Sequence, residues 1–158
     1  WKRNWSKCRA FYFILLKIIK NNKVNIFLDD ERQPEFIKDK IGKLYPKDWI
    51  LVTNYFDFIK IVDDNIGSIN LVSFDHDISS FDTNGKEWTG KDAVDYLIGK
   101  CLDNNRKFPD FYVHTMNVAG RQNIIGVILN YIKHVDKINI NWKYYNNGLI
   151  KNNIIWQF

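Results

Sequence analysis

The sequence predicts an α/β protein built on a small, doubly wound parallel sheet of about five strands. Short apolar runs recur along the chain and end in polar or acidic residues, a pattern typical of parallel strands buried on both faces. Amphipathic helical segments lie between these runs. With 158 residues, of which 46% are hydrophobic, the chain is long enough for one domain with a core of its own.

The apolar runs place the strands in chain order. VNIFLDD (Val24–Asp30) shows the pattern most clearly, because its apolar residues are followed by two acids. Strands that alternate with helices pair in parallel through right-handed crossovers. We therefore expect strands at residues 23–29, 49–53, 69–75 and 110–115, and a weaker fifth strand at 138–142.

The segments between the strands have helical periodicity. Predicted helices cover residues 55–64, 89–105 and 121–134. In the second, Thr89 is a suitable N-cap, and Asp92 and Lys100 suit the two ends of the helix dipole. Its apolar residues recur at helical spacing and form one face: Val94, Leu97, Ile98, Cys101 and Leu102.

Charge is distributed unevenly along the chain. The formal net charge is +5, but residues 1–23 hold seven Lys or Arg and no acid. The rest of the chain holds 16 basic and 18 acidic side chains, a balance of −2. The basic isoelectric point therefore describes the N-terminal segment and does not mark the domain as a nucleic-acid binder.

We divide the chain into a basic, apolar extension (1–22) and a single α/β domain (23–158). The apolar run Ala10–Ile19 contains Lys17 and is too short to span a bilayer, so we expect no transmembrane segment. Two interpretations of the extension remain open. It packs on the domain as an extra helix or strand, or it is an arm that binds a partner protein or a membrane surface.

The C-terminal segment and the cysteines allow two further predictions. YYNNGLIKNNIIWQF (Tyr144–Phe158) contains an Asn-Asn-Gly turn signal and predicts a terminal hairpin. Cys8 and Cys101 lie far apart and form neither a metal-binding motif nor a disulfide framework. They indicate a reducing compartment, so we expect a cytoplasmic location, with Cys101 in the core.

Polar, chemically capable residues follow each of the four main strands. In LVSFDHDISS (Leu71–Ser80), a buried strand is followed by two carboxylates and an imidazole. Taken singly, such groups often only cap helices or bond to nearby backbone. Ligands of open α/β sheets, however, bind beyond the carboxyl ends of the strands. The residues expected at this edge are Asp29, Asp30, Arg32, Thr53, Asn54, Asp75, His76, Asp77, His114, Thr115, Asn117, Gly120 and Arg121.

Three motifs occur in an order and spacing that resemble the cyclic-phosphate processing receiver domain family. They are LDDERQP (Leu28–Pro34), SFDHDI (Ser73–Ile78) and HTMNVAGRQNI (His114–Ile124). The resemblance covers about Lys23 to His134, and it departs from the family where Val118 replaces a common Pro. It implies a receiver-like, flavodoxin-like domain that hydrolyses or otherwise processes cyclic phosphates, including the ends left on cleaved RNA.

Cleavage of a phosphodiester needs an activated water, a donor of a proton to the leaving oxygen and groups that stabilise negative charge. We expect His76 and His114 to transfer protons, with Asp77 orienting a histidine. Asp29, Asp30 and Asp75 resemble the acidic pocket of ordinary receivers and suit Mg²⁺ or Mn²⁺. A metal-free mechanism with two histidines remains open. The expected substrate-binding residues are Arg32, Thr53, Asn54, Thr115, Asn117, Gly120 and Arg121.

Our first hypothesis is a phosphoric diester hydrolase whose partner is a nucleotide or an RNA end that bears a cyclic phosphate. The alternative in signalling is a receiver with Asp75 as phosphoacceptor, because Thr115 and Lys143 follow in suitable order; that role leaves both histidines without a function. Two others are a non-catalytic module that sequesters a nucleotide signal and a structural component of a larger assembly. A haloacid-dehalogenase-like phosphatase fits less well, because its D-x-D motif belongs on the first strand.

Overall fold

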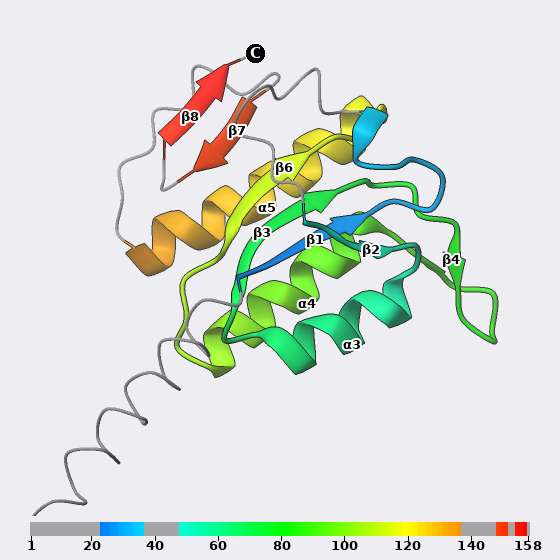
Figure 1. Ribbon diagram of the computed structural model, residues 1–158, viewed down its shortest axis with the longest axis horizontal. Helices are drawn as coiled ribbons and strands as arrows, with labels where there is room; N and C mark the ends of the chain where they lie inside the picture. Colours follow the sequence, from blue (N-terminus) through cyan, green and yellow to red (C-terminus); the bar gives the residue numbers. More distant parts are fainter. Residues whose placement is uncertain (1–22, 37–47, 137–147, 152–153, 158) are drawn as a thin grey trace, which may run out of the picture.

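Four parallel strands form the centre of the fold. The computed structural model describes residues 23–36, 48–136, 148–151 and 154–157. One sheet has the order β2-β1-β3-β6-β7-β8, and its parallel part consists of β2 (Ile50–Val52), β1 (Val24–Leu28), β3 (Ile69–Phe74) and β6 (Asp110–Val113). The four main strands and the α/β fold class predicted from the sequence are confirmed (Figure 1).

The C-terminal hairpin is also confirmed. β7 (Gly148–Lys151) pairs antiparallel with β6 on one side and with β8 (Ile154–Gln157) on the other. Gly148 lies inside β7, so the Asn-Asn-Gly signal precedes the hairpin instead of forming its turn. The extension 1–22, the fifth strand at 138–142 and Lys143 lie outside the described residues.

In the part of the chain that the structure describes, the helices α3, α4 and α5 pack in sequence along one face of the sheet. α3 (Tyr55–Asn65) contacts α4 (Gly90–Asp103), and α4 contacts α5 (Val118–Asp136) (Figure 1). Asn54 caps α3 by accepting a hydrogen bond from the Asp57 N–H at 2.9 Å. Thr89 begins α4 as predicted, with both its N–H and its hydroxyl donating to the Asp92 carboxylate at 2.8 Å. α5 begins at Val118, earlier than the sequence pattern indicates, so Gly120 lies in its first turn.

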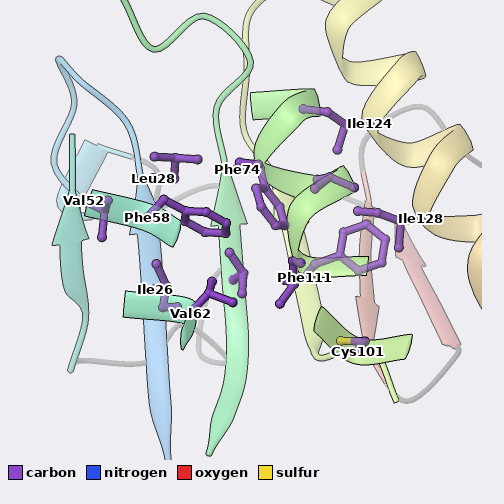
Figure 2. Packing of buried hydrophobic residues seen from close by; sticks show 14 of the residues in the cluster. Ile26, Leu28, Val52, Phe58, Val62, Phe74, Cys101, Phe111, Ile124 and Ile128 are labelled. Atoms are coloured by element: carbon purple, nitrogen blue, oxygen red, sulfur yellow. The ribbon is translucent and has the colours of Figure 1, made fainter. Parts of the chain in front are cut away.

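The hydrophobic core lies between these helices and the sheet. Alternate residues of the strands point toward the helices, and Figure 2 shows how Ile26, Phe74 and Phe111 meet Phe58 and Ile128. Cys101 is buried in this layer, as the sequence predicted. None of the described helices combines the length and apolar character needed to cross a membrane.

The opposite face of the sheet carries a second cluster, formed by Phe27, Leu71 and Tyr112 with Trp49 packed against them. A short element that the sequence pattern does not reveal lies between β3 and α4. It is the two-stranded sheet of β4 (Ser80–Phe81) and β5 (Glu87–Trp88). Its Ser80 hydroxyl accepts a hydrogen bond from the Tyr55 N–H at 3.1 Å, which joins it to the start of α3.

Candidate active site at the carboxyl edge of the sheet

The ends of three neighbouring strands stand at the same level. Backbone hydrogen bonds continue one residue beyond the strands, from the Asp75 N–H to the Leu28 carbonyl and from the His114 N–H to the Phe74 carbonyl, both at 2.9 Å. Asp29, Asp75 and His114 therefore leave the sheet together. Because side chains alternate along a strand, all three lie on the face that carries Phe27.

His114 is buried at this edge, with both ring nitrogens engaged. Its Nε2 lies 2.9 Å from Asp29 Oδ2, and its Nδ1 lies 2.7 Å from Ser73 Oγ. The ring stacks on Phe27 with centroids 4.5 Å apart, and only 4% of the side chain is exposed. Burial lowers the pKa of His114 below its ordinary value, against the opposing effect of Asp29. The imidazole is therefore neutral near pH 7.

The Asp29 carboxylate accepts hydrogen bonds from four protein donors. Its Oδ1 accepts from the N–H groups of Glu31 (2.9 Å) and Arg32 (2.6 Å), and its Oδ2 accepts from His114 and from Arg32 Nε (2.7 Å). Burial alone would raise the pKa of Asp29, but these hydrogen bonds outweigh it and hold the pKa below its ordinary value. Asp29 is thus ionised and fully occupied by protein donors.

Arg32 connects the ends of β1, β3 and β6. Besides Asp29, its guanidinium contacts Asp75 Oδ2 through Nη2 at 2.7 Å and the His114 carbonyl through Nη1 at 3.2 Å. These contacts use three of the five N–H groups of the side chain. The side chain remains 27% exposed. Arg32 is therefore held firmly while two of its donors are outside the described hydrogen bonds.

The three acidic residues form a group suited to a divalent cation. Asp29, Asp30 and Asp75 each offer an oxygen within 4.8 Å of the others. Asp75 Oδ1 has no hydrogen-bond partner among the described residues, although the side chain is only 7% exposed. Three carboxylates and one guanidinium leave a charge of −2 here, which a divalent ion would neutralise. Because Asp29 is occupied, Asp75 and Asp30 are the residues that fit an ion best.

His76 occupies a separate place between the starts of two helices. The Gly90 N–H donates to its carbonyl at 2.8 Å, and its ring lies against Gly120. A Cβ on Gly120 would lie 2.3 Å from the His76 ring. The side chain is 15% exposed, and its buried Nδ1 has no hydrogen-bond partner in the described structure. From the sequence we expected Gly120 to leave room for a ligand. In the structure the His76 ring lies in that space.

Asp77 and the turn before α5 complete this second group. Asn117 Nδ2 lies 3.2 Å from both Asp77 carboxylate oxygens, and its Oδ1 accepts from the Gly120 N–H at 2.9 Å. Asn117 therefore caps α5 and holds Asp77, whose Oδ1 lies 4.0 Å from His76 Nε2. Thr115 Oγ1 accepts from the Asn117 N–H, and the Arg121 guanidinium donates to the Thr115 carbonyl.

The structure thus sorts the predicted site residues into two adjoining groups. The first contains Asp29, Asp30, Arg32, Asp75 and His114, and the second contains His76, Asp77, Thr115, Asn117, Gly120 and Arg121. Two predicted binding residues join neither group in the described contacts: Asn54 caps α3, and Thr53 is exposed after β2.

Sequence reasoning missed Ser73 and Gly90. Ser73 is a hydroxyl residue inside an apolar strand, two positions before Asp75 and so on the same face. That spacing was a usable signal. The sequence offers no such signal for Gly90, because position 90 requires a glycine only where the Asp75 backbone passes close to it. A Cβ there would lie 1.7 Å from the Asp75 carbonyl oxygen.

Comparison with known proteins identifies one family model that matches the chain. The model of the cyclic-phosphate processing receiver domain matches residues 24–130, about two thirds of the chain. This range includes both groups of site residues. No curated protein matches the chain, and no solved structure does. On the family match, the chain belongs to the cyclic-phosphate processing receiver domain family.

Proposed function

We propose that this domain hydrolyses a cyclic phosphodiester, namely a 2′,3′-cyclic phosphate on a nucleotide or at an RNA end. The observation that carries the proposal is Arg32, fixed by Asp29, Asp75 and the His114 carbonyl while two of its N–H groups remain outside the described hydrogen bonds. A pre-positioned guanidinium with spare donors suits the non-bridging oxygens of a phosphate. The family match supports the same class of compound.

His76 is the proposed proton-transfer group. In the reaction, water attacks phosphorus, the bond to one ribose oxygen breaks, and that oxygen receives a proton. One imidazole can accept the proton from water and then deliver it to the leaving oxygen. His76 is partly exposed, and Asp77 Oδ1 lies 4.0 Å from its Nε2, where the carboxylate can help to orient the ring. The product is a phosphomonoester.

His114 has a different proposed role. Because both its nitrogens are engaged with Asp29 and Ser73 and its ring is buried, it is poorly placed to exchange protons with a substrate. Its contacts instead hold Asp29, which in turn holds Arg32. We therefore assign His114 as a positioning residue and His76 as the catalytic one.

A divalent ion fits the acidic group as a cofactor. Asp75 Oδ1 and the Asp30 carboxylate would hold Mg²⁺ or Mn²⁺. When bound, such an ion lowers the pKa of a coordinated water and neutralises phosphate charge. Arg32 supplies a fixed positive charge beside it.

The test is turnover of a 2′,3′-cyclic nucleotide and of a cyclic-phosphate-ended RNA, with and without Mg²⁺ or Mn²⁺. His76→Ala should lower kcat at least 100-fold, in line with the loss of a general acid–base group. His134→Ala, which changes an exposed histidine on α5, is the matched control and should turn over normally. Binding without turnover would identify a non-catalytic module instead. Phosphorylation of Asp75 by acetyl phosphate would favour a signalling receiver.

A further inference from the structure

Ser73 is a buried hydroxyl on the second face of the sheet. It is fully buried in β3 and stands in register between Phe27 of β1 and Tyr112 of β6. A hydroxyl in such apolar surroundings is costly unless it is hydrogen-bonded. Its Oγ lies 2.7 Å from His114 Nδ1. Ser73 therefore contacts the site through His114 and through no other residue of the acidic group in the described structure.

The direction of each hydrogen bond follows from the partners. Asp29 accepts from two backbone N–H groups and from Arg32, so it faces His114 as an acceptor, and His114 Nε2 carries the hydrogen between them. Ser73 Oγ is fully buried and has His114 Nδ1 as its one partner in the described hydrogen bonds, so its hydrogen points to Nδ1, which then carries a lone pair. Ser73 is left as the donor to Nδ1. These contacts form a hydrogen-bond network that runs from Ser73 through His114, Asp29 and Arg32 to Asp75.

We propose that Ser73 is a positioning residue that selects the Nε2–H tautomer of His114 and thereby orients Asp29 and Arg32. The stack on Phe27 fixes the plane of the imidazole but favours neither tautomer. The Ser73 hydroxyl at Nδ1 and the carboxylate at Nε2 favour the same form, since the other form would turn a lone pair toward Asp29 and take the acceptor away from the Ser73 hydroxyl. The consequence for substrate rests on the proposed function, in which Arg32 holds the phosphate.

The structural test uses the full chain labelled with ¹⁵N, and it does not depend on activity. Wild type should show His114 in the Nε2–H form and an Arg32 Nε–H protected from exchange with water. In Ser73→Ala, the His114 signals should show mixed tautomers, and the Arg32 Nε–H should exchange at least tenfold faster. Ser80→Ala removes another buried serine hydroxyl, which is not part of this hydrogen-bond network, and should leave both signals unchanged.

Two results would overturn the inference. One is an Nδ1–H tautomer of His114 in the wild type, which decides the matter even where a variant fails to fold. The other is a folded Ser73→Ala protein whose His114 tautomer and Arg32 exchange match those of the wild type. Ser73→Thr retains the hydroxyl and should retain both signatures, which separates loss of the hydroxyl from general disturbance of β3.

The kinetic test measures the consequence at the site. Since Arg32 contacts phosphate in both ground and transition states, Ser73→Ala should raise KM for a 2′,3′-cyclic nucleotide about tenfold and change kcat little. Ser73→Thr should restore KM. An unchanged KM in Ser73→Ala would contradict the positioning role. An inactive wild type that shows the expected tautomer would refute the proposed function and leave the role of Ser73 standing.

Discussion

Gly120 shows how a single residue shapes the proposed catalytic group. The His76 side chain occupies the space that a side chain at Gly120 would need, since a Cβ there would lie 2.3 Å from His76 Cγ and 2.8 Å from its Cβ. The imidazole and Gly120 are thus fitted to one another. Any residue larger than glycine must move His76 away from Asp77 or displace the start of α5.

We predict that Gly120→Ala displaces His76. The overpacking should cost about 1–3 kcal/mol in the free energy of unfolding, and the ring signals of His76 should shift in ¹H–¹³C spectra. Gly126→Ala is the matched control, because nothing lies within 4 Å of its added methyl group. Unchanged His76 signals in a stable Gly120→Ala protein would show that the close contact is not a constraint.

The strand-end residues were predictable because the register of parallel strands brings their carboxyl ends together. The sequence indicated Asp29, Asp75 and His114 at one edge, and backbone hydrogen bonds place them there. Their roles were less predictable. Carboxylates of the same chain anchor the guanidinium of Arg32, and His114 is buried against Phe27. Both contacts depend on side-chain packing, which the spacing of residues in the sequence does not describe.

The helices were predicted well where capping and periodicity agreed. Thr89 and Asp92 begin α4 as expected. The β4–β5 sheet was missed because strands of two residues are too short to show alternation. It is held by side-chain contacts instead: Trp88 stacks on Tyr55 with centroids 4.5 Å apart, and Lys86 Nζ lies 3.5 Å from the centroid of the indole ring.

The start of α4 depends on a glycine. A Cβ at Gly90 would lie 1.7 Å from a backbone oxygen of Asp75, which cannot rotate away. We predict that Gly90→Ala destabilises the protein by about 3 kcal/mol, at the upper end of typical overpacking costs. Urea unfolding measures this loss.

We expect Gly99→Ala in α4 and Gly126→Ala in α5 to stabilise the protein, in contrast to Gly90→Ala. Neither added methyl group meets an atom within 4 Å. Each should stabilise the protein by about 0.5–1 kcal/mol, because alanine favours helix over glycine. A Gly90→Ala protein as stable as these two would contradict the close approach of α4 to the end of β3.

For the molecule as a whole, the parallel core follows from alternating patterns, and the sequence predicted it. The order of the strands in the sheet is harder to predict from the sequence, because an apolar run does not indicate which other strand it pairs with. The hairpin of β7 and β8 was predicted from a turn signal that proved to lie before it. Two further Asn residues separate the strands, so composition alone could not choose between the candidate turns.

The buried His114 makes the stability of the molecule depend on pH. Its folded pKa lies below the ordinary value of 6.5, so below pH 6.5 the unfolded chain binds a proton that the folded protein does not. The stability that the neutral His114 gives to the folded protein is fully present above pH 6.5, and it is lost as the pH falls toward the folded pKa. The loss should approach about 1.4 kcal/mol per pH unit.

Urea unfolding at pH 7.5, 6.5 and 5.5 measures this dependence. Relative to wild type, His114→Gln should lose less stability between pH 6.5 and 5.5, because glutamine does not titrate. His134→Gln, at an exposed position of α5, should leave the slope nearly unchanged. Asp29 does not interfere, since its lowered pKa places its effect below pH 3.8. Equal slopes for wild type and His114→Gln would contradict a neutral, buried imidazole.

The most direct test of the central claim is ³¹P NMR of a 2′,3′-cyclic nucleotide incubated with the full chain and Mg²⁺. The account predicts that the cyclic phosphate signal is replaced by that of a phosphomonoester with wild type and with His134→Ala, and that His76→Ala leaves the substrate intact over the same time. Conversion at the wild-type rate by His76→Ala, or no conversion by the wild type, would contradict the proposed hydrolase.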